Sequence, residues 1–441
     1  MDSLRSPQAM DILKQLQAQA EQAEVVHLRT EATTVEFEAN RFKTSKVEET
    51  SGVAVRVVRN GRLGFSASSD ERALDRLVNN VLESAAFGDE VPISFPAPGP
   101  APRVSAFDPA IPDLPVERLV AIGQEIVDLM LSTDPGVQVN VSLKRGVEHI
   151  TIRNQAGTEA AFQRSPLSIG VELARIEGDD VLILYDMLGT TEWDADYMAF
   201  ARRLAEKLKL ARRLATMRTA RMPVLFAPAG ALTLALPLME GVDGKNVFNG
   251  VSPLCSKVGQ KLFNEKVTLV DDGTLNGRFG SAPYDDEGVP HRRNVLLDRG
   301  VLGSFLYDLK TAAQSGVEST GNGSRELFRP PRPAPTNLIL AGGETPLAQI
   351  IASIDDGLLV EDVLGLGQGN IISGAFSNPL SLAFRIEHGE IVGRVKDVSI
   401  AGNVYDLLKD VAAVSRETQW VYGSFCLPYI LLPDINVVAK E

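Results

Sequence analysis

The sequence changes character near residue 222, and this change constrains the fold more than any other feature. Before it, apolar residues alternate with polar ones as in strands, or recur at helical spacing. After it, apolar stretches are short and are separated by turn dipeptides such as Asn276-Gly277 and Asp356-Gly357. We expect an α+β fold with two domains, a mixed N-terminal domain over residues 1–221 and a β-rich C-terminal domain over residues 222–441.

Helical and strand patterns divide the N-terminal half. Helices are predicted over residues 10–23, 71–86, 116–132 and 194–216. The dipeptide Asn60-Gly61 predicts a tight hairpin turn. Eight of the 25 prolines fall in residues 92–115, which indicates an extended connection. Strands are predicted over 25–29, 33–39, 52–59, 62–66, 137–144, 148–154, 159–164, 168–175 and 180–188.

The charge balance bears on the partners of the chain. The sequence has 44 Lys and Arg against 57 Asp and Glu, a net charge of −13. An acidic surface repels phosphate backbones, so we expect no nucleic-acid partner. The basic helix over 194–216 is therefore expected to present a solvated face or to bind an internal acid.

The N-terminus lacks the apolar core of a signal peptide, and the longest apolar run, 224–239, contains prolines and is too short to span a bilayer. We expect a cytoplasmic protein without a membrane partner.

Few residues are suited to metal or nucleophilic chemistry. The histidines at 27, 149, 291 and 388 lack the spacing of zinc ligands, although a site assembled from distant ligands stays open. No Gly-x-Ser-x-Gly elbow is present, and Cys255 and Cys426 lie among apolar neighbours, where thiols are usually inert. The acidic runs at 271–272, 285–287 and 355–356 adjoin glycine turns, which favours turn residues over a cation site. The glycine-rich segments 320–324 and 365–370 are interpreted as tight turns because neither matches a phosphate-binding motif.

A combination of motifs in the C-terminal half resembles the TldD/PmbA family, also called modulators of DNA gyrase. The matching segments are Val270-Asp-Asp-Gly-Thr274, Asp285-Asp-Glu-Gly288, Asn294-Val-Leu-Leu, Gly300-Val-Leu, Thr320-Gly-Asn-Gly323, Pro335-Thr-Asn337, Ile372-Ser-Gly374 and the segment that begins Leu427-Pro-Tyr. The resemblance covers essentially the whole chain and implies a C-terminal domain of the TldD/PmbA type. It implies one of two branches. TldD-like members carry H-E-x-x-x-H on a helix and a cysteine near the C-terminus as zinc ligands, whereas PmbA/TldE-like members lack the histidines and pair with the first type as a heterodimeric peptidase.

The zinc-binding residues of the family are missing from this sequence. In the register suggested by the resemblance, Ala235 and Glu240 stand where the two histidines would be, and Leu236 stands where the glutamate would be. Cys426 matches the third ligand, but one cysteine cannot hold a catalytic zinc. No histidine occurs between His149 and His291, so a shifted register does not restore the site. The chain is therefore similar to the PmbA/TldE-like branch, with no metal or cofactor of its own and zinc expected in a TldD-like partner.

The resemblance implies a subunit that is inactive alone and that processes peptides with a TldD-like partner. Its expected contribution is one wall of a peptide-binding chamber, with Asn322, Arg325, Gln368 and Asn370 as candidate contacts because they are polar side chains on glycine loops. One alternative is a homodimeric scaffold that binds peptides or proteins without cleaving them. Another is an independent hydrolase that uses Cys426 or a carboxylate site. The sequence specifies neither the peptide nor the oligomeric arrangement.

Overall fold

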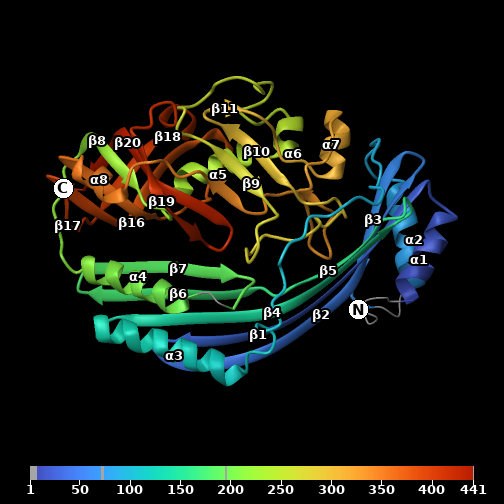
Figure 1. Cartoon of the computed structure of the whole chain (residues 1–441), viewed down its shortest axis with the longest axis horizontal. Coiled ribbons are helices and arrows are strands. Elements are labelled where there is room, and N and C mark those ends of the chain that lie inside the picture. The colour runs from blue at the N-terminus through green and yellow to red at the C-terminus, as the bar shows by residue number, and fades with distance from the viewer. Residues whose placement is uncertain (1–6, 71–73, 194–195, 441) are drawn as a thin grey trace.

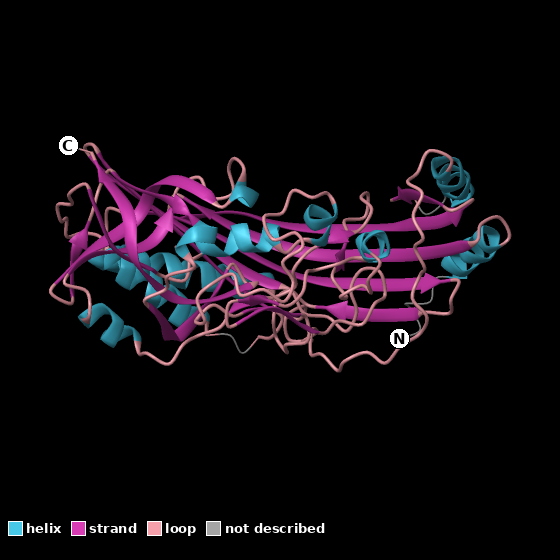
Figure 2. Ribbon diagram, turned by 90° about the horizontal axis from the view of Figure 1, so that it is seen from above, coloured by secondary structure: helices cyan, strands magenta, loops and turns pink. Residues whose placement is uncertain are grey.

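The N-terminal half forms one long, curved antiparallel sheet. The computed structural model describes residues 7–70, 74–193 and 196–440. The sheet has seven strands in the order β3-β2-β1-β4-β6-β7, with β5 also paired to β4. The elements of this half are α1 (Pro7–Gln17), β1 (Gln22–Glu38), β2 (Arg41–Arg59), β3 (Arg62–Ser68), α2 (Leu74–Ala85), α3 (Val116–Thr133), β4 (Gln138–Asn154), β5 (Glu159–Arg164), β6 (Leu167–Glu177), β7 (Asp180–Thr190) and α4 (Tyr197–Leu210). The long strands extend past the C-terminal half to reach α1 and α2 (Figures 1 and 2).

The strands of this sheet are longer than the sequence predicts. The segments 25–29 and 33–39 form the single strand β1, and 137–144 and 148–154 form the single strand β4. These strands stay continuous because β1 pairs with β2 on one side and with β4 on the other along nearly its whole length. Tertiary pairing thus carries the strands across polar residues that interrupt the apolar pattern.

The ends of the helices also differ from prediction. The predicted helix over 10–23 ends at Gln17, because β1 begins at Gln22. The predicted start of α2 at residue 71 and that of α4 at residue 194 lie outside the described residues. In the described part, α4 ends at Leu210, and the Asp196 side chain accepts a hydrogen bond from Ala199 N at its beginning. The Asn60-Gly61 hairpin is confirmed, since both residues have positive φ, 52° and 71°.

The C-terminal half is β-rich, and the α+β prediction is confirmed. Its 11-stranded sheet has the order β11-β10-β9-β14-β20-β18-β16-β15-β8, and β8 also pairs with β20. This extra pairing closes β20, β18, β16, β15 and β8 into a ring. The elements are β8 (Ala220–Phe226), α5 (Leu232–Gly241), α6 (Gly244–Phe248), β9 (Leu269–Asp272), β10 (Arg293–Asp298), β11 (Val301–Leu302), α7 (Leu309–Ser315), β12 (Gly323–Ser324), β13 (Arg332–Pro333), β14 (Leu338–Leu340), α8 (Leu347–Ala352), β15 (Asp356–Val363), the 3₁₀ helix η2 (Ile371–Ser373), β16 (Ala375–Glu387), β17 (Glu390–Arg394), β18 (Val398–Asn403), α9 (Val404–Leu407), β19 (Ala413–Val421) and β20 (Phe425–Ala439).

A shared core joins the two halves. One apolar cluster combines residues of α3, α4 and the long sheet with Leu225, Leu359 and Phe384 of the C-terminal sheet. The basic helix α4 takes part through Lys207, which forms an ion pair with Glu361 of β15 at 2.8 Å. An internal acid partner for this helix was one of its expected roles. In the described part of the chain, no helix has both the length and the hydropathy needed to cross a bilayer.

Candidate functional site

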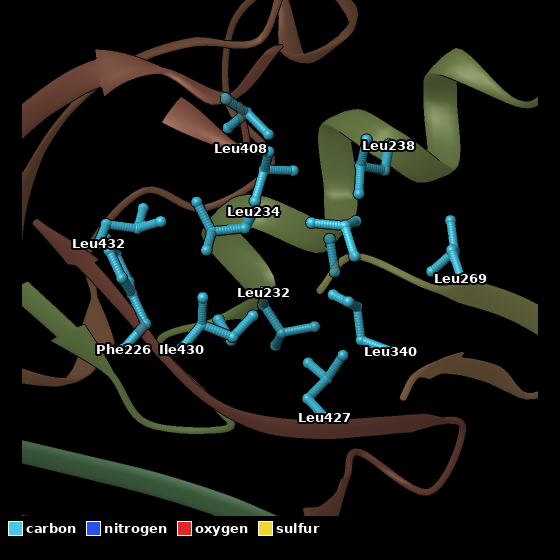
Figure 3. Packing of buried hydrophobic residues seen from close by; sticks show 14 of the residues in the cluster. Phe226, Leu232, Leu234, Leu238, Leu269, Leu340, Leu408, Leu427, Ile430 and Leu432 are labelled. Carbon is cyan, nitrogen blue, oxygen red and sulfur yellow. The ribbon is translucent and has the colours of Figure 1, made fainter. Parts of the chain in front are cut away.

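Helix α5 is the element on which the sequence places the lost zinc site. Leu232, Leu234 and Leu238 pack into the largest apolar cluster of the C-terminal half. This cluster includes Phe226, Ile430 and Leu432 (Figure 3). Ala235 is fully buried in the same cluster. A side chain at position 235 therefore faces the core rather than solvent.

The residues present do not fit a zinc ion. Ala235 and Leu236 offer no ligand atom, and the Glu240 carboxylate accepts a hydrogen bond from Asn246 Nδ2 at 3.0 Å. Cys426 is buried, which raises the pKa of its thiol. Side chains alternate along a strand, and the neighbouring Leu427 packs in the α5 cluster, so Cys426 points away from that helix. Within the described ranges, no three histidine, cysteine, aspartate or glutamate side chains are placed to hold a metal ion.

A groove of about 580 Å³ runs along the open side of α5, and we call it the α5 groove. Thr233, Leu236 and Pro237 line it from the helix. The glycine loop 365–369, which follows β15, lines the opposite wall together with the start of β16. The structure thus brings the sequence-predicted residues Leu236 and Gln368 into one site. Asn370 lies at the start of η2, one residue beyond the loop.

One buried polar group of the α5 groove lacks a partner. Thr233 is 3% exposed, and its hydroxyl has no hydrogen-bond partner among the described residues. Pro237 stands four residues later and has no N–H to donate to the Thr233 carbonyl. The carbonyl of Pro237 itself accepts a hydrogen bond from the Tyr405 hydroxyl at 2.8 Å. A buried hydroxyl without a partner is costly, and a bound ligand with hydrogen-bonding groups would remove that cost.

The glycines of the opposite wall are required by the backbone. Gly365, Gly367 and Gly369 have φ values of 73°, 82° and 80°, a region that strongly favours glycine. The loop therefore presents main chain, with Gln368 as its one long polar side chain. Such a surface can bind an extended chain through main-chain hydrogen bonds.

A second hollow of about 560 Å³ adjoins the α5 groove. Leu364 and Pro379 line both. The second hollow reaches the exposed apolar residues Val181 and Ile183 of β7. Lys396 also lines this end and lies 3.7 Å from Asp180. The two hollows therefore adjoin, and we call the pair the channel; their lining residues extend from α5 to β7, the edge strand of the N-terminal sheet.

Asn322 and Arg325, the other two candidate contacts, lie elsewhere. Asn322 is 2% exposed, and its Nδ2 donates to Asp271 Oδ2 at 2.6 Å. The Arg325 side chain is buried and pairs with Glu24 of β1 at 2.7 Å. The structure therefore does not bring these two residues to the α5 groove.

The partners of Arg325 form a buried ionic cluster between the halves. Arg56 of β2 binds Glu24 through two hydrogen bonds of 3.0 and 2.8 Å, and it binds Glu287 at 2.5 Å. Burial acts to raise the pKa of Glu24, but Arg325 and Arg56 hold it below its usual value. Burial raises the pKa of Glu287 to about 7. The acidic run 285–287, interpreted from sequence as turn residues, thus supplies an inter-domain anchor.

Sequence reasoning missed Thr233 and the apolar walls of the groove. A signal for Thr233 was present, because a proline within a helical pattern frees the carbonyl four residues earlier. The walls contributed by β7 and β16 had no local signal, because they depend on packing between distant strands. Asn322 and Arg325 are candidate contacts by sequence because they stand on a glycine loop, but both side chains are buried and bind the distant acidic residues Asp271 and Glu24.

Comparisons with known proteins agree with this architecture. Residues 219–439 match the model of the PmbA/TldA metallopeptidase C-terminal domain, and residues 23–85 match that of PmbA/TldA metallopeptidase domain 1. The metalloprotease TldD homolog of Buchnera aphidicola subsp. Acyrthosiphon pisum is 35% identical over 42% of this chain and 38% of its own length. The metalloprotease PmbA of Escherichia coli O157:H7 is 25% identical over 95% of this chain and 92% of its own. The crystal structure of TldE from Thermococcus kodakarensis superposes with a TM-score of 0.90 at 23% identity, over 98% of this chain and all of that one.

Proposed function

Because the chain belongs to the TldD/PmbA family of metallopeptidase-related proteins, we propose that it is the PmbA/TldE-like subunit of a heterodimeric peptidase. The observation that carries this proposal is the α5 groove itself. It has an unpartnered buried hydroxyl and a glycine-rich wall, yet the helix beside it offers no set of zinc ligands. The combination suits a subunit that binds peptide without hydrolysing it.

In this proposal the catalytic metal belongs to a TldD-like partner in the cytoplasm. Zinc bound there supplies the Lewis acid that activates water for attack on a peptide carbonyl. This chain binds and orients the peptide. The hydroxyl of Thr233 and the backbone of the glycine loop hydrogen-bond to its main chain, while Leu236 contacts its side chains.

The lining of the channel favours an extended polypeptide as the substrate. A main-chain hydrogen-bonding surface binds many sequences, because every residue carries the same backbone groups. Apolar positions on both walls, Leu236 and Val181 among them, favour peptides with apolar side chains. We therefore expect unfolded segments to be processed in preference to folded domains.

The test is reconstitution with the TldD-like subunit of the same organism. We expect zinc-dependent cleavage of an unstructured peptide by the mixture, and neither activity nor bound zinc in this chain alone. Size-exclusion chromatography should show a complex of the two subunits. Equal activity of the chain alone, or failure of the two to associate, would contradict the proposal. Peptide binding without any gain of activity on mixing would favour the homodimeric binding scaffold.

Thr233→Val removes the free hydroxyl while keeping the shape of the side chain. We expect the reconstituted enzyme to lose about 3- to 10-fold in kcat/KM, the value of one hydrogen bond of about 1 kcal/mol. Thr216→Val is the matched control, since Thr216 is exposed and does not line the groove. If the two variants have the same kcat/KM, the Thr233 hydroxyl does not contact substrate.

A further inference from the structure

A separate cavity of about 230 Å³ lies between the N-terminal sheet and the C-terminal half, and we call it the β5 cavity. Phe162 and Arg164 of β5 form one wall. Asp286 and His291 belong to the opposite wall, with Tyr284 next to the aromatic ring of Phe162. None of the residues assigned to the α5 groove lines this cavity.

Four of the motifs singled out in the sequence meet at this cavity. Asp271 accepts hydrogen bonds from Asn322 Nδ2 and from the backbone N–H of Thr336, both at 2.6 Å. Asn322 and Thr336 in turn line the cavity, as do Asp285 and Asp286. The wall is thus held rigidly by buried hydrogen bonds, as a preorganised binding site requires.

His291 presents an unpartnered atom to this cavity. The side chain is 8% exposed, and its Nδ1–H donates to the carbonyl of Gly321 at 2.7 Å. Burial lowers its pKa to about 4, so the ring is neutral near pH 7. A neutral imidazole that donates through Nδ1 has an acceptor at Nε2, and this atom has no partner among the described residues. A ligand that donates a hydrogen bond would satisfy it.

The charged groups of the cavity do not pair with one another. Oδ2 of Asp286 accepts the backbone N–H of Arg325 at 2.9 Å, and Oδ1 has no partner in the described ranges. Arg164 lies 3.3 Å from Glu148 and donates to the carbonyl of Phe279, while its Nε is buried without a partner in the part of the chain that the structure describes. A free carboxylate oxygen and a guanidinium therefore line one small space without forming a salt bridge to each other.

We propose that the β5 cavity binds a small zwitterion, a free α-amino acid or a dipeptide. The ammonium group of the ligand donates to Asp286 Oδ1 and His291 Nε2, and its carboxylate accepts from Arg164. Its side chain packs against Phe162 and Tyr284. A simple anion would use only Arg164, and a simple amine would use only Asp286 and His291. Binding at this cavity requires neither the partner subunit nor zinc, because every group belongs to this chain.

Calorimetric titration of the isolated full-length chain tests the proposal with four probes. L-Leucine and Gly-Leu keep both charged ends, leucinamide lacks the carboxylate, and N-acetyl-leucine lacks the ammonium group. We expect one or both zwitterions to bind, and each blocked derivative to bind at least 10-fold more weakly. Binding of leucine alone assigns a free amino acid, and binding of Gly-Leu alone assigns a dipeptide. Absence of binding by both, or equal binding of a blocked derivative, would overturn the proposal.

A variant locates the site. Asp286→Asn is expected to weaken binding of the better zwitterion at least 10-fold. The matched control Asp75→Asn changes an exposed carboxylate of α2 that lines neither this cavity nor the channel, and it should leave binding unchanged. Unchanged affinity in a folded Asp286→Asn protein would overturn the assignment. The comparison of blocked ligands needs no variant, so the proposal stays testable if Asp286→Asn does not fold.

Discussion

Arg56 shows how strongly a single buried charge can bind the two halves together. Its side chain is 1% exposed and is paired with two fully buried glutamates. Replacing it with methionine keeps most of its volume but leaves Glu24 and Glu287 without its charge. We expect Arg56→Met to lower the free energy of unfolding by about 3–5 kcal/mol. Chemical denaturation measures this loss.

The control is an arginine in an exposed ion pair. Arg218 is 68% exposed and lies 3.0 Å from Asp356. Arg218→Met should cost less than about 1 kcal/mol, because solvent screens exposed pairs. Equal losses in the two variants would mean that the buried cluster contributes no more than a surface pair.

Asp271 predicts an unusual pH dependence of stability. Burial raises its pKa to about 7, well above the value of about 3.9 in an unfolded chain. The folded state therefore holds the proton more tightly, and the contribution of Asp271 to stability, complete below about pH 4, is lost as pH rises through about 7. His291 acts in the opposite sense, because its lowered pKa favours the folded state as pH rises from about 4 to 6.5.

Comparing the stability of the wild-type protein with that of Asp271→Asn isolates the contribution from titration of Asp271. The stability advantage of the wild type over the variant should shrink between pH 5 and pH 8, by at most about 1.4 kcal/mol per pH unit. Urea denaturation at several pH values gives this difference, in which the effect of His291 cancels. A difference that stays constant with pH would show that Asp271 does not titrate in this range.

At the scale of elements, α5 has two faces that differ in how well they tolerate a polar substitution. Ala235 is fully buried among leucines, whereas the neighbouring Leu236 is half-buried and lines the groove. Ala235→His should lower the free energy of unfolding by about 3 kcal/mol or more, since it overpacks the core and buries a polar ring. Leu236→His introduces the same ring on the groove side and should cost about half as much or less. Thermal and urea denaturation compare the two, and equal losses would contradict the assigned faces.

Elements were predictable from the sequence where local chemistry determines them. The Asn60-Gly61 turn and α3 are close to their predicted limits, because turn geometry and apolar periodicity are local properties. The lengths of β1 and β4 were not predictable, because pairing with neighbours extends them. For the proposed site, the sequence singled out Leu236 of α5 and Gln368, which line the same groove. It could not locate the cavity walls, which are made by strands distant in sequence.

At the scale of the whole molecule, the shared core predicts that the halves unfold together. Leu225 and Phe384 of the C-terminal sheet pack in one cluster with Leu204 of α4, and the Arg56 cluster adds a second buried connection. A domain boundary near residue 221 would therefore separate two sheets, but neither half would be stable without the other. Separating them would expose apolar surface that each half buries against the other.

The two tryptophans allow this to be measured, because Trp193 lies in the N-terminal half and Trp420 in β19. Trp420→Phe leaves fluorescence from the first half alone, and Trp193→Phe leaves it from the second. After correction for the stability of each variant by circular dichroism, we expect both fluorescence transitions to coincide with loss of secondary structure. A transition of one tryptophan well before the other would show that the halves unfold separately, and that the shared cluster contributes less than the cores on either side of it.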